Sequence, residues 1–341
     1  MVSVGRADDS GSVVVNARDV INGASKWSCE QSDAIEFLRS LPDDSIDLLF
    51  TSPPYMAART YGRDDVARDC QEWVAWMIHV VKAAAPKVRG LIAINCEGQT
   101  SNFCYEPAPF MLMALLHQAG FKLRKPPIFC RIGIPGSGGP DWLRNDYEPI
   151  VCVTRGKLPW SDNTACGHPP KWAPGGEMSN RLSDGKRVNQ WGPVGSKKGS
   201  GKRFHHGKES NGEEKPRPSH KVTRNGTFRH AEDGTVKGSH DRDICAIANP
   251  GNVLEFTVGG GVMGHPLAHE NEAPFPLGLP AFFVKSFCPP GGIVCDPFSG
   301  SGTTCHAAIE NGRRFIGCDL RASQVDLCER RMATVTPPLF A

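Results

Sequence analysis

Apolar positions along the chain follow two recurring arrangements, separated by short polar stretches. Compact, mostly apolar runs such as 46–50 are typical of buried strands, whereas apolar residues at intervals of three or four are typical of amphipathic helices. The first arrangement predicts strands at 46–50, 91–95, 127–132, 149–153, 252–258, 293–296 and 314–318; the second predicts helices at 33–41, 69–84, 107–119, 280–287 and 303–311. Because strands and helices alternate, we expect an α/β fold with a mostly parallel sheet.

This regular pattern stops after Thr154 and resumes near Asn252. Between them Gly, Ser, Lys, Arg, Asn and Pro dominate, and residues 155–243 carry 18 Lys and Arg against 10 Asp and Glu, although the whole chain has a net charge of only +3. A basic segment within an otherwise acidic chain favours contact with a polyanion, while a solvated, partly disordered loop has the same composition. We therefore expect a loose N-terminal arm at 1–26, two halves of one domain at 27–154 and 251–335, and an irregular basic insert at 155–250.

Composition and cysteine spacing argue against several classes of protein. The chain is 39% hydrophobic and has no run of the roughly 18 to 20 apolar residues that span a bilayer, and its N-terminus lacks the features of a secretory signal. The 13 cysteines are scattered and no two have Cys-x-x-Cys spacing, so we expect reduced thiols in a cytoplasmic protein. The adjacent His205 and His206 have no partners at metal-ligand spacing, so no metal site is expected.

A glycine-rich turn separates the predicted strand at 293–296 from the helix that follows it. Gly300 and Gly302 allow the backbone to turn sharply and approach a ligand, and Asp319 follows nineteen residues after Gly300, at the end of the next strand, where an acid can bind ribose hydroxyls. The turn has neither the third glycine of a dinucleotide fingerprint nor the Gly-Lys-Thr of a P-loop. Thr303 and Thr304 instead suit a small zwitterion, so we expect a ligand with adenosine and a modest charged tail.

A second motif, Thr51-Ser52-Pro53-Pro54-Tyr55, directly follows the strand predicted at 46–50. Prolines cannot extend a strand, so the motif lies on a loop at the carboxyl end of that strand. Alone, such a loop is equally typical of a rigid turn without any function.

The two motifs together resemble the catalytic and cofactor loops of DNA amino-methyltransferases. Thr51–Tyr55 is similar to the catalytic loop and Asp296–Thr304 to the S-adenosylmethionine-binding loop, and their order with the insert between them is that of the β group of this family. The resemblance covers 27–155 and 250–332. It implies a Rossmann-like sheet with helices on both faces, a catalytic half at 27–154, a target-recognition insert and a cofactor-binding half at 251–335.

The resemblance also assigns roles to individual residues. Asp33 is similar to an acid that lies near the adenine of the cofactor, although a helix N-cap is an equally good interpretation of this residue. Phe275 is similar to a residue of the element that covers the methionine end of the cofactor, although packing in the core is the simpler interpretation. The family often has Glu where this chain has the shorter Asp319. The implied S-adenosylmethionine-binding residues are Asp33, Thr51, Phe275, Asp296, Phe298, Ser299, Gly300, Ser301, Gly302, Thr303, Thr304 and Asp319.

The implied reaction is methylation of an exocyclic amine on a DNA base. Ser52 Oγ and the Pro53 carbonyl would accept hydrogen bonds from the amine, Pro53 and Pro54 would stiffen the loop, and Tyr55 would stack on a base swung out of the duplex. Transfer would be a direct in-line displacement. Ser at the first position favours cytosine N4 and leaves adenine N6 as the alternative. An RNA or protein amino-methyltransferase and a DNA-binding protein with a decayed site remain open.

The insert is the implied reader of duplex DNA. Its basic side chains would neutralise phosphates and make the affinity depend on salt. A cognate restriction endonuclease is a candidate partner of such an enzyme. The basic residues that we expect to contact DNA are Lys197, Lys198, Lys202, Arg203, Lys208, Lys221 and Arg224.

Overall fold

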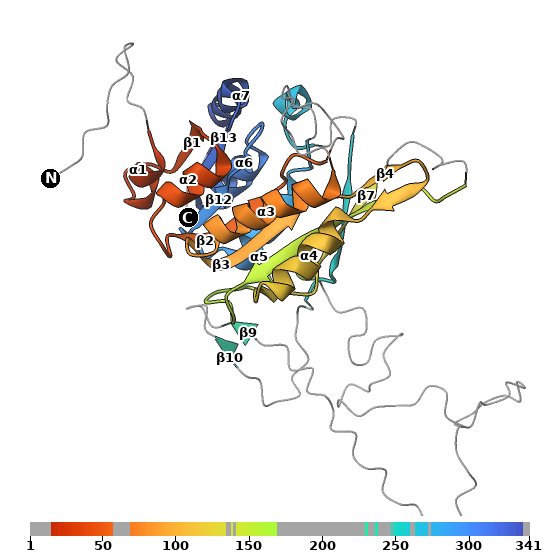
Figure 1. The fold of residues 1–341 in the computed structure, drawn as a ribbon. Coiled ribbons are helices and arrows are strands. Elements are labelled where there is room, and N and C mark those ends of the chain that lie inside the picture. Colours follow the sequence, from red (N-terminus) through yellow and green to blue (C-terminus); the bar gives the residue numbers. More distant parts are fainter. Residues whose placement is uncertain are drawn as a thin grey trace, which may run out of the picture.

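The computed structural model describes residues 15–56, 69–133, 138, 141–168, 229–230, 236–237, 247, 249–259, 263–271 and 274–336. Within them a nine-stranded sheet has the strand order β1-β13-β12-β2-β3-β8-β7-β11, and β6 pairs with β8 beside this path (Figure 1). The strands of this sheet are β1 (Trp27–Gln31), β2 (Ile46–Thr51), β3 (Val88–Asn95), β6 (Lys122–Leu123), β7 (Ile128–Ile132), β8 (Tyr147–Thr154), β11 (Val253–Thr257), β12 (Ile293–Asp296) and β13 (Arg314–Asp319).

The sheet is mostly parallel, as the alternation of strands and helices predicts. The five strands β1, β13, β12, β2 and β3 run parallel to one another, and β7 runs parallel to β11. Only β8 reverses the direction, because it pairs antiparallel with β3, β6 and β7. The carboxyl ends of β1, β13, β12, β2 and β3 therefore lie along one edge of the sheet, where both motifs are found.

Helices cover both faces of the sheet, so the expected α/β architecture is confirmed. On the near face in Figure 1 lie α2 (Ala34–Ser40), α3 (Cys70–Ala84) and α4 (Ala108–Gln118), which contact one another in that order. On the other face α5 (Gly278–Phe287), α6 (Thr303–Glu310) and α7 (Ala322–Met332) form a second layer. Each layer has its own buried core: Leu49 of β2 belongs to the first, while Leu48 and Phe50 belong to the second. The run at 46–50 is apolar on both sides because both sides are covered.

Several elements were not predicted from the sequence. These are α1 (Ala17–Ile21), the two-stranded sheets β4 (Gln99–Ser101) with β5 (Cys104–Glu106) and β9 (Arg229–His230) with β10 (Val236–Lys237), the 3-10 helix η1 (Pro266–Glu270), and β1, β6 and α7. In α1 the Asn16 side chain accepts from the backbone of Asp19, whose carboxylate accepts in return from Asn16. Residues 16–21 of the expected loose arm therefore form a capped helix.

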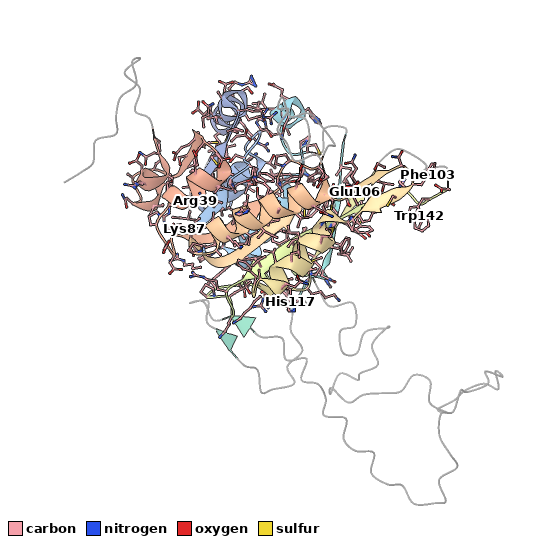
Figure 2. All side chains as sticks on the ribbon, viewed as in Figure 1. Arg39, Lys87, Phe103, Glu106, His117 and Trp142 are labelled. Atoms are coloured by element: carbon pink, nitrogen blue, oxygen red, sulfur yellow. The ribbon has the colours of Figure 1, made fainter. Side chains whose placement is uncertain are left out.

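The β4–β5 hairpin carries an exposed aromatic tip. Phe103 occupies the turn with a φ of 61° and is 79% exposed. Trp142, on the segment between β7 and β8, is 77% exposed and points outward at the same end of the molecule in Figure 2. This end of the structure therefore offers apolar surface to solvent.

Two further features of the described residues concern the cysteines and the helices. The twelve cysteines within the described residues are all free, and most of them are buried in the two cores, where they pack as small apolar side chains. Across the same residues, none of the helices has the length and apolar character needed to cross a membrane.

Candidate functional site

The catalytic-type loop and the glycine loop meet where β2 and β12 end side by side. Thr51 is the last residue of β2 and Asp296 the last residue of β12, and these strands are paired although the two residues are 245 positions apart. The Thr51 hydroxyl donates to Asp296 Oδ1 at 2.6 Å, and both side chains are buried. The two motifs recognised in the sequence therefore form one site.

Asp296 is the hydrogen-bond centre of the glycine loop. Its Oδ1 also accepts from the backbone N–H of Phe298 at 3.0 Å, and its Oδ2 accepts from the Thr304 hydroxyl at 2.7 Å. Burial raises the pKa of Asp296 to about 6 by penalising the charged form, although these three hydrogen bonds act in the opposite direction. The carboxyl group joins the ends of two strands and the start of α6, and so fixes the shape of the loop.

Gly300 and Gly302 are required by the backbone of this loop. Both have positive φ angles, 49° and 75°, and Gly302 is the N-cap residue of α6. A Cβ on Gly302 would lie 2.5 Å from the Cys328 Sγ, and a Cβ on Gly300 would lie 3.0 Å from the Asn271 Nδ2. The close approach expected of these glycines is thus made, in part, to neighbouring segments of the protein itself.

The acid predicted to bind ribose lies against the glycine loop. Asp319 ends β13, and its Oδ2 accepts from the Gly300 N–H at 3.0 Å while its Oδ1 accepts from the Arg321 N–H at 3.0 Å. The backbone N–H of Ser32 donates to the Asp319 carbonyl at 3.1 Å, which brings the loop after β1 to the same place. Asp33 on that loop caps α2, so its reading as a helix N-cap is confirmed.

Four other residues expected at the cofactor have side chains that are buried and bonded within the protein. Ser299 Oγ donates to the Asp296 carbonyl at 3.0 Å, and Thr304 bonds to Asp296 as described. Thr303 Oγ1 accepts from the buried Arg331 of α7 at 2.8 Å. Arg331 also donates to the Ser301 hydroxyl oxygen at 3.5 Å and to the Ser301 carbonyl at 3.4 Å. Arg331 could not be predicted from the sequence, because arginine on a buried helix face breaks the apolar periodicity that predicts helices.

The two phenylalanines of the expected cofactor site are half-buried and pack on aromatic neighbours. Phe275 makes an edge contact with Phe50 of β2, with ring centroids 5.9 Å apart, and belongs to the margin of the second core. Phe298 makes an edge contact with Trp76 of α3 at 5.4 Å. The packing role anticipated for Phe275 is therefore present.

The Ser-Pro-Pro-Tyr loop is held by a contact from α3 and by a hydrogen bond within the loop. The Trp73 indole N–H of α3 donates to the Pro54 carbonyl at 2.8 Å. Within the loop, the Ser52 hydroxyl donates to the Tyr55 hydroxyl oxygen at 3.3 Å, and Pro53 between them is buried. These contacts reduce the freedom of the loop beyond what its two prolines provide.

The Tyr55 hydroxyl is bound to a buried polar cluster that the sequence did not predict. This hydroxyl donates to Glu148 Oε2 of β8 at 2.7 Å and accepts from the Asn95 amide of β3 at 3.1 Å. The same amide donates to Glu148 Oε2 at 2.6 Å, and Arg131 of β7 pairs with Glu148 Oε1 at 3.3 Å. Asn95 and Glu148 are polar residues at the ends of two otherwise apolar strands, β3 and β8. This position is the one feature of the sequence that could have indicated the cluster.

The residues expected to contact DNA lie outside the described residues, so their role stays a prediction. These are Lys197, Lys198, Lys202, Arg203, Lys208, Lys221 and Arg224, together with His205 and His206.

Comparisons with known proteins place the chain among DNA methylases. The type II methyltransferase M.PvuII of Proteus hauseri is 23% identical over 318 residues, which cover 86% of this chain and 80% of that protein. The methylase YubD of Escherichia coli K12 is 42% identical over 67 residues, and M.BglI of Bacillus subtilis is 38% identical over 65 residues. These two matches cover only 29% and 19% of the relatives' own length.

Solved structures show the same fold. The PvuII DNA methyltransferase (cytosine-N4-specific) superposes with a TM-score of 0.57 at 17% identity, covering 90% of this chain and 86% of that one. TTHA0409 of Thermus thermophilus, solved with S-adenosyl-L-methionine, gives a TM-score of 0.52 at 19% identity, covering 92% and 98%. The family model described as DNA methylase, for N6 and N4 methyltransferases, matches residues 46–330. The chain that joins these two loops through Thr51 and Asp296 belongs to this DNA methylase family.

Proposed function

We propose that this protein transfers a methyl group from S-adenosylmethionine to an exocyclic amine of a DNA base, with cytosine N4 as the preferred target. The observation that carries the proposal is the 2.6 Å hydrogen bond between Thr51 and Asp296. It fixes the catalytic-type loop against the glycine loop, so that a methyl donor on one loop and an amine on the other would lie next to each other. Holding two reactants next to each other in this way supplies a large part of the rate enhancement of a two-substrate reaction.

The residues at the glycine loop fit a nucleoside cofactor. Gly300 and Gly302 give the turn its left-handed backbone, and Asp319 holds a carboxylate at the neighbouring strand end, within hydrogen-bond distance of Gly300. Asp33 lies on the loop after the adjacent strand β1. Asp319 would bind the ribose, Asp33 would lie near the adenine, and Phe275 and Phe298 would contact the methionine end. When bound, S-adenosylmethionine supplies a methyl group on a positively charged sulfur.

The residues of the Ser-Pro-Pro-Tyr loop have the groups that the target amine requires. An exocyclic amine is a weak nucleophile, because its lone pair is delocalised into the ring. Ser52 Oγ and the Pro53 carbonyl would each accept a hydrogen bond from one of the two N–H groups of the amine. These two hydrogen bonds would favour the geometry in which the nitrogen lone pair points toward the methyl group. The Tyr55 ring would stack on the base outside the duplex. No side chain needs to form a covalent bond with the base.

The preference for cytosine rests on Ser52 and on the fold. Ser at this position goes most often with cytosine N4, and the PvuII enzyme, which has this fold, is described as cytosine-N4-specific. Adenine N6 remains the second candidate, since the DNA adenine methyltransferase YhdJ of Escherichia coli is 36% identical over 83 residues. The type II relatives also support a restriction endonuclease as a partner in the cell.

Mass spectrometry of nucleosides from unmodified DNA, after incubation with the purified protein and S-adenosylmethionine, tests the proposal. We expect N4-methylcytosine, and no product with the Ser52→Ala variant. N6-methyladenine would keep the reaction and overturn the preferred base. A wild-type protein that methylates RNA or protein but not DNA would overturn the proposed substrate, and one that binds DNA without transferring a methyl group would indicate a decayed site.

A further inference from the structure

Beside the proposed amine-binding loop, four polar side chains form a chain of hydrogen bonds with one direction. Ser52 donates to the Tyr55 hydroxyl at 3.3 Å, and Tyr55 donates to Glu148 at 2.7 Å. The Asn95 amide donates to both Tyr55 and Glu148. The proton of each hydroxyl therefore points toward Glu148 and away from the site.

The direction of this chain is set at its buried end. Glu148 is 7% exposed, and Arg131 pairs with it at 3.3 Å. A carboxylate paired with Arg131 accepts hydrogen bonds and does not donate them, so Tyr55 gives its only proton to Glu148. The Tyr55 oxygen can then only accept from Ser52. As a result the Ser52 hydroxyl proton is directed inward, and its lone pairs remain available to accept from an amine.

We propose that Glu148 is a positioning residue of the methyl-transfer site, which acts through Tyr55 to keep Ser52 an acceptor of the target amine. The inference rests on the proposed function and goes beyond it, because it gives the Tyr55 hydroxyl a task separate from stacking. Without Glu148, the Ser52 hydroxyl is free to donate to the nitrogen lone pair, which is the electron pair that must attack the methyl group.

The variant Glu148→Gln tests the direction of the chain while keeping the size of the side chain. The introduced amide has one acceptor oxygen where the carboxylate has two, and three donors face it, namely Arg131 on one side and Asn95 and Tyr55 on the other. The Tyr55 hydroxyl therefore loses the negative charge that holds its proton inward, and this proton becomes free to turn toward Ser52. Ser52 would then present its own proton to the site. Burial and, secondly, the charge of Glu148 raise the pKa of Tyr55 well above its ordinary value, which agrees with a tyrosine held as a donor.

Steady-state kinetics on duplex DNA give the first measurement. We expect Glu148→Gln to lower kcat by about 10- to 100-fold, because a misplaced reacting group slows a reaction by a factor of this size. The KM for DNA should change by less than about threefold. Tyr55→Phe keeps the stacking ring and should lower kcat by a similar factor. Because both act through one chain, the double variant should be no slower than the slower single variant. Glu255→Gln on the exposed face of β11 is the matched control and should leave kcat unchanged.

Carbon-13 NMR of labelled tyrosine gives a second measurement that does not depend on activity. The protein has only 4 tyrosines, so the Tyr55 resonance can be assigned with Tyr55→Phe. We expect Glu148→Gln to move the Tyr55 Cζ resonance at neutral pH, while Glu255→Gln leaves it in place. Thermal unfolding of each variant separates these effects from loss of fold.

The outcomes separate this inference from the proposed function. A wild-type protein that methylates DNA, with Glu148→Gln as fast as wild type, overturns the inference alone. So does a fully active Tyr55→Phe, because stacking would then be the whole role of Tyr55. Multiplying losses in the double variant also contradict it. If the folded wild-type protein transfers no methyl group to any DNA, the proposed function fails first and the inference fails with it.

Discussion

Asp296 is a carboxyl group whose burial and whose hydrogen bonds act in opposite directions. It is 1% exposed, and its pKa is raised to about 6 from an ordinary value of 3.8, mainly by desolvation and to a small degree by the charge of Asp319. Because the pKa in the folded state lies above that of the unfolded chain, the folded state binds the proton more tightly. The stabilisation is complete below about pH 4 and is lost as the pH rises through about 6.

We therefore predict that wild-type protein loses stability relative to Asp296→Asn between pH 4 and pH 7. The loss should be about 3 kcal/mol, because a shift of one pKa unit corresponds to about 1.4 kcal/mol. Urea unfolding of both proteins at several pH values measures it, and taking the difference removes the contribution of all other carboxyl groups. A difference that does not change with pH would show that Asp296 is already ionised in the folded state throughout this range.

A turn can require glycine either because its φ angle is positive or because there is no space for a Cβ atom, and a comparison of Gly302 with Gly291 distinguishes the two reasons. Gly291 has nearly the same φ, 70° against 75°, but no atom lies within 4 Å of the Cβ that it would carry. We predict that Gly291→Ala costs about 1 to 2 kcal/mol through strain alone. Gly302→Ala should cost about 1 to 3 kcal/mol more, because its Cβ would lie 2.5 Å from the Cys328 Sγ. Denaturant unfolding measures both, and equal losses would mean that Cys328 moves aside freely.

At the scale of elements, α3 supports the catalytic-type loop as well as the core. Trp73 is fully buried in α3 and its indole N–H donates to the Pro54 carbonyl at 2.8 Å. We predict that Trp73→Phe lowers kcat about tenfold, because the loop loses its fixed position, and lowers stability by about 1 kcal/mol or more through the lost hydrogen bond and the space left behind.

Trp27→Phe in β1 is the matched control for this prediction, since Trp27 packs at the margin of the second core, whereas Trp73 belongs to the first. It should change the melting temperature without changing kcat. A Trp73→Phe protein that is less stable but as fast as wild type would show that the prolines alone hold the loop.

The elements that could be predicted from the sequence are those whose buried faces are uniformly apolar. The strand at 46–50 and its neighbours β3 and β12 are covered on both faces, so they appear as apolar runs. By contrast, β1 carries Glu30 and Gln31, and α7 buries Gln324 and Arg331 besides its apolar residues, so neither has a clear apolar pattern. Ser52, Asp296 and Asp319 could be selected as candidate residues from the sequence, because the motifs that contain them are local.

The parts of the site that were missed depend on contacts between distant segments. Glu148 meets Tyr55 across 93 residues, and Asn95 meets Glu148 across 53. No local spacing records such a pair. In the same way, the role of Arg331 behind Ser301 and Thr303 becomes visible only when α7 lies against the glycine loop.

At the scale of the whole molecule, the site combines the two ends of the described chain. The parallel pairing of β12 with β2 joins the segment after residue 250 to the segment before residue 155, and the basic insert connects the two. The described residues form the sheet and both cores. The lysines and arginines at 197–224 lie outside the described residues, and their contact with duplex DNA stays a proposal.

We predict that the basic insert sets the salt dependence of DNA binding. Replacing Lys197, Lys198, Lys202 and Arg203 by alanine should weaken binding to every duplex sequence and reduce the slope of log K against log salt by about 3 to 4, because each neutralised phosphate contributes about 0.9. Fluorescence anisotropy with a labelled duplex between about 50 and 200 mM salt measures this slope. The control is Lys82→Ala with Lys285→Ala, which removes two exposed lysines from α3 and α5 and should leave the slope unchanged. If both proteins keep the wild-type slope, the phosphates are neutralised elsewhere, and the insert is a solvated loop despite its charge.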